Sequence, residues 1–241
     1  MPIYKIADLN ILINPMSSHM QKRLEPYIQD CDCPDFEIKL SREDVLRCLA
    51  RTKELGNECA AEGTLILNEI CTRVLEQYDG FFFHSSALML NGEAYLFTAK
   101  SGTGKSTHTG LWRTLFKDKV VMINDDKPIV RKIGGVFYAC GTPWMGKSNI
   151  GSNIKAPVRA VYVLQRGENN SVVRVKPGDV FKQLLEATVV PKNRENMVKL
   201  LSLYDELFTC ADLFLLKCNT DISAARIAYE AVIKDTHKDK R

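Results

Sequence analysis

The sequence predicts an α/β fold in which a mixed sheet carries a phosphate-binding loop and is flanked by helices. Three observations lead to this prediction. Between residues 81 and 140, short apolar runs of strand length are separated by turn residues such as Asn91-Gly92. A glycine-rich loop at 101–107 follows one of these runs and precedes a helical pattern. Helical and strand-like segments then alternate toward the end of the chain, which is typical of α/β proteins.

The composition is that of an ordinary folded domain. A chain of 241 residues fits one large domain, or one domain with a smaller annex. Hydrophobic residues make up 45% and charged residues 26%, which excludes disorder as the main state. No apolar run approaches the ~18 residues of a membrane span, and residues 1–8 lack a leader pattern, so we expect a cytoplasmic protein without a membrane partner. The net charge of +4 is dispersed, which predicts no nucleic-acid partner.

The eight cysteines are expected to be reduced thiols. A chain of this length can build its own core, and nothing in its opening residues indicates secretion. Cys31 and Cys33 are separated by one residue, and no second Cys or His pair stands at zinc-site spacing. We therefore expect no metal at that pair.

Residues 1–78 are expected to form an α+β annex. Partial alternation predicts a strand over 4–13 that stops at Asn14-Pro15, followed by irregular residues 15–35 and an edge strand over 36–40. Ser41 and Asp44 have the spacing of a capping box, which predicts a helix over 42–54. Apolar spacing predicts a second helix over 61–77, and Asp79-Gly80 ends it.

Residues 79–233 are expected to form the nucleotide-binding core, and 234–241 a charged tail. Gly134-Gly135 predicts a hairpin turn. Residues 141–156 are rich in Gly, Ser, Asn and Pro, and a loop of this length in a compact domain is usually functional. The predicted strands are 81–84, 87–90, 94–99, 120–123, 129–132, 136–140, 158–164 and 213–216, and the predicted helices are 105–116, 178–188, 194–208 and 222–233.

The strongest motif is the loop at 101–107. It reads Ser101-Gly102-Thr103-Gly104-Lys105-Ser106-Thr107, and alanine stands at position 99 where such loops usually begin with glycine. The two glycines let successive backbone N–H groups point inward, and the N-terminus of the following helix adds partial positive charge. Lys105 is then expected to reach the β- and γ-phosphates, and the Ser106 hydroxyl to bind Mg²⁺.

Two adjacent acids follow the predicted strand 120–123. An aspartate at the end of this strand is expected to face the magnesium ion held by the loop. Side chains alternate along an extended segment, so one of Asp125 and Asp126 can bind metal while the other accepts the proton of a substrate hydroxyl.

His84 completes the candidate site through a family resemblance. The segments His84-Ser85-Ser86-Ala87, 101–107 and Asn124-Asp125-Asp126 together resemble the nucleotide core shared by HPr kinase/phosphorylase and phosphoenolpyruvate carboxykinase, in order and in spacing. The resemblance implies that fold and covers about residues 81–130. It implies a metal-ligand and catalytic role for His84, metal binding by Asp126, and Asp125 as the catalytic base.

A second stretch is similar to small stand-alone HPr-kinase-like proteins of bacteria. It comprises Gly141-Thr142-Pro143-Trp144, Gly146-Lys147, Ala156-Pro157 and Leu164-Gln165-Arg166-Gly167. In the larger relatives a basic residue beyond the acidic pair holds the transferred phosphoryl group. The resemblance implies this role for Lys147, with Arg159 or Arg166 as substitutes, and leaves Trp144 as either a core residue or part of a lid.

The resulting expectation is an ATP-dependent kinase that phosphorylates a hydroxyl with Mg²⁺ or Mn²⁺. The acceptor is a seryl side chain of a protein or peptide, or a small metabolite, and pyrophosphate is an alternative donor. The region before residue 80 does not resemble the N-terminal domain of HPr kinases, so HPr is not the expected acceptor. The chain has no room for the large lobe of full carboxykinases, which disfavours decarboxylation. A non-catalytic nucleotide-binding regulator is the other alternative, and a homo-oligomer is left open.

Overall fold

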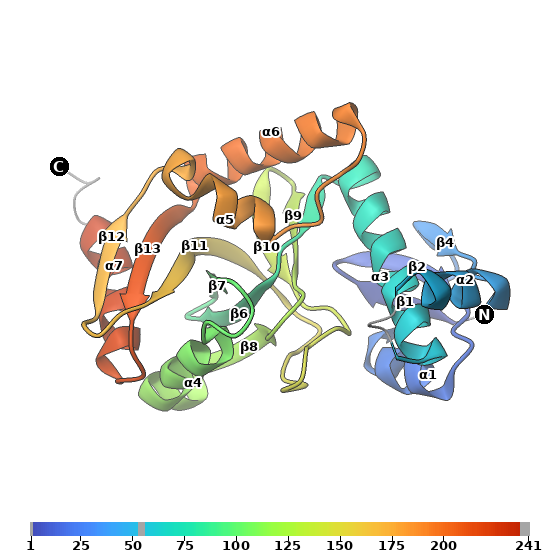
Figure 1. Cartoon of the computed structure of the whole chain (residues 1–241), viewed down its shortest axis with the longest axis horizontal. Coiled ribbons are helices and arrows are strands. Elements are labelled where there is room, and N and C mark those ends of the chain that lie inside the picture. The colour runs from blue at the N-terminus through green and yellow to red at the C-terminus, as the bar shows by residue number, and fades with distance from the viewer. Residues whose placement is uncertain (1, 53–55, 237–241) are drawn as a thin grey trace.

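The computed structural model describes residues 2–52 and 56–236, which form two β-sheets with helices packed around them (Figure 1). The smaller sheet has four strands in the order β3-β1-β2-β4 and belongs to the N-terminal part of the chain. The elements of this part are β1 (Ile3–Ile6), β2 (Leu9–Ile13), α1 (Ser18–Leu24), a 3-10 helix (Glu25–Tyr27), β3 (Ile28–Gln29), β4 (Phe36–Ile38), α2 (Arg42–Arg51) and α3 (Glu58–Gln77).

The larger sheet has nine strands and mixes parallel with antiparallel pairs. Seven strands run in the order β5-β9-β10-β11-β7-β6-β8, and β13 pairs with both β11 and β12. The fold is thus a curled, mixed α/β sheet flanked by helices, as the sequence predicts (Figure 1). The strands are β5 (Gly80–Phe82), β6 (Ser85–Leu90), β7 (Glu93–Thr98), β8 (Val120–Asn124), β9 (Ile129–Ile133), β10 (Val136–Cys140), β11 (Lys155–Arg166), β12 (Ser171–Arg174) and β13 (Asp212–Cys218).

Helices cover both faces of the larger sheet. Their bounds are α4 (Lys105–Phe116), α5 (Phe181–Glu186), α6 (Arg194–Cys210) and α7 (Ser223–Thr236), with short 3-10 helices at Lys117–Lys119 and Pro177–Val180. Because side chains alternate along a strand, Phe97 packs with Trp112 of α4 on one face while Leu96 packs with residues of α5 and α6 on the other. None of the helices among the described residues is both long and apolar enough to cross a bilayer.

The order of three strands brings the candidate site together. Strand β6 lies between β7 and β8 and is antiparallel to both, so β7 and β8 run in the same direction. Their C-terminal ends therefore meet at one edge of the sheet, and β6 begins at that edge. The phosphate-binding loop follows β7, the acidic pair follows β8, and His84 directly precedes β6.

The annex differs from the sequence prediction in two places. The predicted strand 4–13 is a hairpin of β1 and β2, whose turn residues Ala7 and Asp8 both have positive φ, +51° and +61°. This is the conformation of a tight hairpin turn, but it lacks the usual Asn-Gly signal. Residues 15–35, expected to be irregular, contain α1, which Ser17 caps by accepting a hydrogen bond from the Met20 N–H.

Other predicted elements differ mainly at their ends. The predicted edge strand 36–40 is confirmed as β4, and α2 begins at the predicted capping box of Ser41 and Asp44 and ends at Arg51. Residues 53–55, at the end of the predicted helix 42–54, lie outside the described residues. The short strand β12 was not predicted, and Lys234, assigned to the charged tail, lies within α7. Residues 237–241 of the tail also lie outside the described part.

The annex shares a hydrophobic core with the larger sheet. Ile129 of β9, Cys140 of β10 and Trp144 pack with the buried side chains of β1, β2 and α3. Arg131 of β9 strengthens this junction, because its guanidinium donates to the carbonyls of Ala7 at 2.8 Å and Tyr78 at 3.2 Å and is itself buried. The two sheets are therefore joined by apolar packing and by a charged side chain bonded to main-chain carbonyls.

Candidate active site

The phosphate-binding loop joins β7 to α4. Gly102 and Gly104 have φ of +77° and +121°, which L side chains rarely adopt, so the curl of the loop requires glycine at both positions. Lys105 is the first residue of α4, and its Nζ donates to the Ala99 carbonyl at 3.2 Å. Burial lowers the pKa of the Lys105 ammonium, and the nearby charges of Asp126 and Asp125 oppose that shift. The loop thus presents a partly desolvated cation beside two carboxylates.

Asp125 is held by two serine hydroxyls. The Ser86 hydroxyl, on β6, donates to Oδ1 at 2.7 Å, and the Ser148 hydroxyl, in the loop 141–156, donates to Oδ2 at 2.5 Å. Asp125 is only 7% exposed. Each carboxylate oxygen of the predicted base therefore has a hydroxyl partner, and a hydroxyl is the group from which such a base would take a proton.

Asp126 is paired with the predicted metal ligand His84. His84 Nε2 lies 3.0 Å from Oδ1, and Lys127 Nζ lies 3.2 Å from Oδ2. Burial raises the pKa of Asp126, but the hydrogen bond from His84 and the charge and hydrogen bond of Lys127 outweigh it, so this pKa lies below its ordinary value. The Asp126 carboxylate is consequently ionised near neutral pH and available to a cation.

Asn124 shapes the turn that carries both acids. Its side-chain Oδ1 accepts hydrogen bonds from the backbone N–H groups of Asp126 at 2.9 Å and Lys127 at 2.6 Å. Its Nδ2 donates to the carbonyl and hydroxyl oxygens of Thr142, and Thr142 in turn donates to the Lys127 carbonyl at 2.7 Å. The buried Asn124–Thr142 pair therefore fixes the direction in which the two carboxylates point.

The loop 141–156 lies against the acidic pair. Gly146 has φ of +67°, and a Cβ added there would lie 2.8 Å from Cβ of Asp126. Lys147 and Ser148 follow and are exposed. A cleft of about 540 Å³ joins these parts, and it is lined by His84, Ser101, Gly102, Gly104, Lys105, Ser106, Thr107, Asp125, Asp126, Gly146, Lys147 and Ser148.

The cleft brings together nearly all of the residues that the sequence singled out. Thr103, the remaining loop residue, does not line it. Lys147, expected to hold the transferred phosphoryl group, does line it. Its two substitutes do not: Arg159 pairs with Asp212 at 2.6 Å, and Arg166 donates to the loop carbonyls of Gly102 at 2.6 Å and Thr103 at 3.3 Å.

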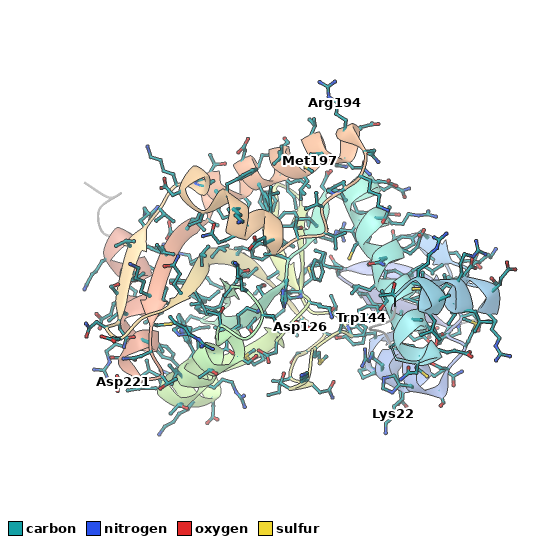
Figure 2. All side chains as sticks on the ribbon, in the orientation of Figure 1. Lys22, Asp126, Trp144, Arg194, Met197 and Asp221 are labelled. Carbon is teal, nitrogen blue, oxygen red and sulfur yellow. The ribbon has the colours of Figure 1, made fainter. Side chains whose placement is uncertain are left out.

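Four contributors to the site were not predicted from the sequence. Ser86 and Asn124 stand inside the motifs of His84 and of the acidic pair, but no role was assigned to either. Ser148 and Thr142 lie in a segment whose composition indicated a functional loop without indicating which side chains face the acids. Trp144, left open between core and lid, is a core residue that is 5% exposed and packs with the annex (Figure 2).

A second cavity of about 410 Å³ adjoins the cleft through Lys127. Helices α1 and α3 of the annex line it together with Lys127 and Trp144. Its ionisable side chains of basic type are His19, Arg23 and Lys127, and no Asp or Glu is among the described residues that line it. The annex thus contributes a basic wall next to the acidic pair.

The donor set of the cleft fits Mg²⁺ held jointly with a nucleotide. Mg²⁺ prefers oxygen ligands and usually binds through one or two carboxylates together with substrate phosphates. Asp126 and the Ser106 hydroxyl supply such oxygens in the cleft. No cluster of three or more His, Cys, Asp or Glu side chains suited to a metal occurs in the described part of the chain.

All eight cysteines are free thiols, as predicted.

Comparison with solved structures finds a distant likeness in fold. The chain is similar to the HPr(Ser) kinase/phosphatase from Coxiella burnetii, with a TM-score of 0.36 and 10% sequence identity, over 66% of this chain and 97% of that one. No protein-family model and no curated protein matches the chain. A likeness at this TM-score assigns no activity, so the function has to be argued from the chemistry of the cleft.

Proposed function

We propose that this protein is a phosphotransferase that moves the γ-phosphoryl group of ATP to a hydroxyl acceptor with the help of Mg²⁺ or Mn²⁺. One observation carries the proposal. A glycine-rich loop with its lysine, two adjacent carboxylates and a histidine converge on a single cleft, although they come from three separate strand ends. A site that only binds phosphate does not need the second carboxylate, whereas phosphoryl transfer to a hydroxyl uses it as a base.

The loop and α4 would bind the phosphates of the donor. Backbone N–H groups of 101–106 and the start of α4 favour anions, and Lys105 would turn its ammonium from the Ala99 carbonyl toward the β- and γ-phosphates. Mg²⁺, when bound, would neutralise phosphate charge, and Asp126 and Ser106 would hold it. His84 donates to Asp126 Oδ1 and would orient this carboxylate or add a ligand of its own.

Asp125 would accept the proton of the acceptor hydroxyl. Its Oδ1 is fixed by Ser86, and its Oδ2 is bound by a hydroxyl in the structure. Lys147, on the exposed side of the cleft, would steady the phosphoryl group during transfer. Such catalysis depends mainly on positioning and on charge neutralisation.

The acceptor would be a seryl side chain of a protein or peptide, or a small hydroxylated metabolite. The basic cavity beside Lys127 favours an acceptor that also carries a negative charge. Pyrophosphate stays an alternative donor, because the loop and Lys105 would contact phosphates and no contact with a base or ribose is required of them.

A thermal-shift titration tests the nucleotide site. Wild type and Lys105→Ala are titrated with Mg²⁺ plus ATP, GTP or pyrophosphate, and ligand at ~100 Kd stabilises by about 2.7 kcal/mol, or roughly 5–10 °C at this chain length. We expect a shift in wild type that Lys105→Ala loses. If no donor shifts wild type, the proposal fails.

Asp125→Asn then separates an enzyme from a regulator. For an enzyme, this variant keeps the nucleotide-induced shift but loses phosphoryl transfer by orders of magnitude, because the amide accepts protons poorly. Asp126→Asn should lose transfer as well, since it removes a metal ligand. A non-catalytic nucleotide-binding regulator would show no measurable phosphoryl transfer in wild type, and Asp125→Asn would signal or bind its partner as wild type does.

A further inference from the structure

The hydroxyl of Ser148 occupies the place that an acceptor hydroxyl needs. It donates to Asp125 Oδ2 at 2.5 Å, within the range of charge-assisted hydrogen bonds. The other carboxylate oxygen is bound by Ser86, which is fully buried in β6, whereas Ser148 is exposed at the cleft. Of the two hydroxyls on the predicted base, only that of Ser148 can therefore be approached from the phosphate-binding loop.

The turn that carries Ser148 is built against both acids. Gly146 and Asn149 have positive φ, +67° and +50°, so the chain reverses sharply on either side of Lys147-Ser148. At one end of the turn, Gly146 lies so near Asp126 that no Cβ would fit between them, and at the other the Ser148 hydroxyl donates to Asp125. The Met145 carbonyl lies 3.3 Å from the same Ser148 hydroxyl and is a second, more distant acceptor for its single proton, so the turn itself helps to direct this side chain.

Ser148 and the phosphate-binding loop line the same cleft. Gly102, Gly104, Lys105 and Ser106 line it together with Lys147 and Ser148. A γ-phosphoryl group held by the loop would therefore share the cleft with a serine that already donates its proton toward a carboxylate. Lys147, next to this serine, supplies a positive charge to the same cleft.

We propose that Ser148 is phosphorylated by the protein itself, within one molecule. The inference rests on the proposed phosphotransferase function and names a first acceptor for it. Asp125 Oδ2 takes the proton of the Ser148 hydroxyl, and Oγ forms a bond to the γ-phosphorus of ATP. The bond between this phosphorus and the β–γ bridging oxygen breaks, and ADP leaves with the electron pair. The products are phosphoserine 148, protonated Asp125 and ADP.

The modification changes the cleft by simple electrostatics. A phosphoserine carries about −1.5 to −2 charges at pH 7. This charge stands where the Ser148 hydroxyl was bonded to the Asp125 carboxylate, and repulsion between like charges moves the turn away from Asp125. The base becomes open to an external acceptor.

The test uses the whole chain of 241 residues with Mg²⁺ and ATP and no added acceptor. Intact-mass spectrometry is expected to show the gain of one phosphoryl group per chain, and peptide mapping to place it on Ser148. Ser148→Ala is expected to gain no phosphoryl group, and Ser148→Thr, which restores a hydroxyl, to be phosphorylated again. Ser152→Ala, which removes another serine of the same loop, serves as the matched control and is expected to be labelled like wild type.

Two further measurements make the result decisive. The labelling rate is followed over a wide range of protein concentration, and a constant first-order rate supports transfer within one molecule, whereas a rate that rises with concentration overturns it. The nucleotide-induced thermal shift is recorded on the same samples. A shift in wild type without phosphoserine 148 overturns this inference and leaves the nucleotide site standing, while no shift overturns both. A cooperative melting transition of Ser148→Ala shows that this variant folds.

Discussion

Gly146 offers a direct test of whether the position of Asp126 matters. Replacing it with alanine adds a Cβ that would lie 2.8 Å from Cβ and 3.3 Å from Oδ2 of Asp126. Ordinary van der Waals contact begins near 3.4 Å, so one of the two residues has to move by about half an ångström. Asp126 is also bonded to His84 and Lys127, which means that its displacement disturbs the whole charged group.

Gly146→Ala has two effects, one on folding stability and one on catalysis, and different measurements report them. The φ of +67° is strained for alanine and costs about 1–2 kcal/mol of folding stability. A displacement of 1 Å in an active site can reduce the rate by about a hundredfold, so a shift of half that size is expected to lower kcat/KM by about tenfold to a hundredfold. That range corresponds to about 1.4–2.7 kcal/mol of transition-state stabilisation.

The control variant is Gly134→Ala. Gly134 has φ of +58° and an added Cβ meets nothing within 4 Å, so this variant carries the backbone strain without the collision. Urea unfolding is expected to show a similar loss of stability for both variants. Binding of Mg²⁺ with ATP, measured by calorimetry, and phosphoryl transfer should be impaired in Gly146→Ala alone. Equal binding and turnover in the two variants would refute the role given to Asp126.

Three further predictions concern other parts of the chain. Burial lowers the pKa of His108 to about 4 from 6.5. The contribution of the neutral imidazole to folding stability is therefore complete above pH 6.5 and is lost as the pH falls toward 4, a change of about 3 kcal/mol in the free energy of unfolding. Urea unfolding of His108→Gln should lack this part of the pH dependence, and parallel curves of unfolding free energy against pH for both proteins would contradict the prediction. Arg131→Met leaves the buried Ala7 carbonyl and the partly buried Tyr78 carbonyl without their donor and should lower the free energy of unfolding by about 3 kcal/mol. A loss below about 1 kcal/mol, the range of surface ion pairs, would contradict the anchoring role. Ser86→Ala removes the hydroxyl that holds Asp125 Oδ1 and should lower kcat about tenfold at unchanged KM for ATP. The neighbouring Ser85 hydroxyl donates to the Phe83 carbonyl instead, so Ser85→Ala should leave kcat unchanged. Equal turnover in the two variants would contradict the prediction.

Local signals predicted the order of elements well where each residue type has one strong backbone preference. Asn91-Gly92 and Gly134-Gly135 form the predicted hairpin turns with positive φ at both positions. The turn at Ala7-Asp8 has the same conformation, but alanine does not favour it, so packing of the flanking strands determines it. Helix α1 is short, and its N-terminus depends on Glu62 of α3, which accepts hydrogen bonds from Met16 and Ser17 across 45 residues or more of sequence.

The candidate site also has one part that local sequence predicts and another part that it does not. Loop 101–107 and the acidic pair are continuous in sequence, so their types and spacing indicate their chemistry directly. The partners of Asp125 come from two other segments, Ser86 at 39 residues before it and Ser148 at 23 residues after it. Such contacts depend on strand register and loop path, which a single sequence does not encode in any local pattern.

The contacts of Arg131 bear on whether the annex and the larger sheet can fold as separate fragments. Its donors satisfy main-chain oxygens of the annex from a strand of the larger sheet, and Ile129, Cys140 and Trp144 seal the same junction. A fragment that begins after α3 would expose this apolar surface and leave the guanidinium without its acceptors. The annex is therefore not expected to fold independently of the larger sheet. Each fragment is expected to be insoluble when expressed alone, and to be recovered in soluble form when both are co-expressed.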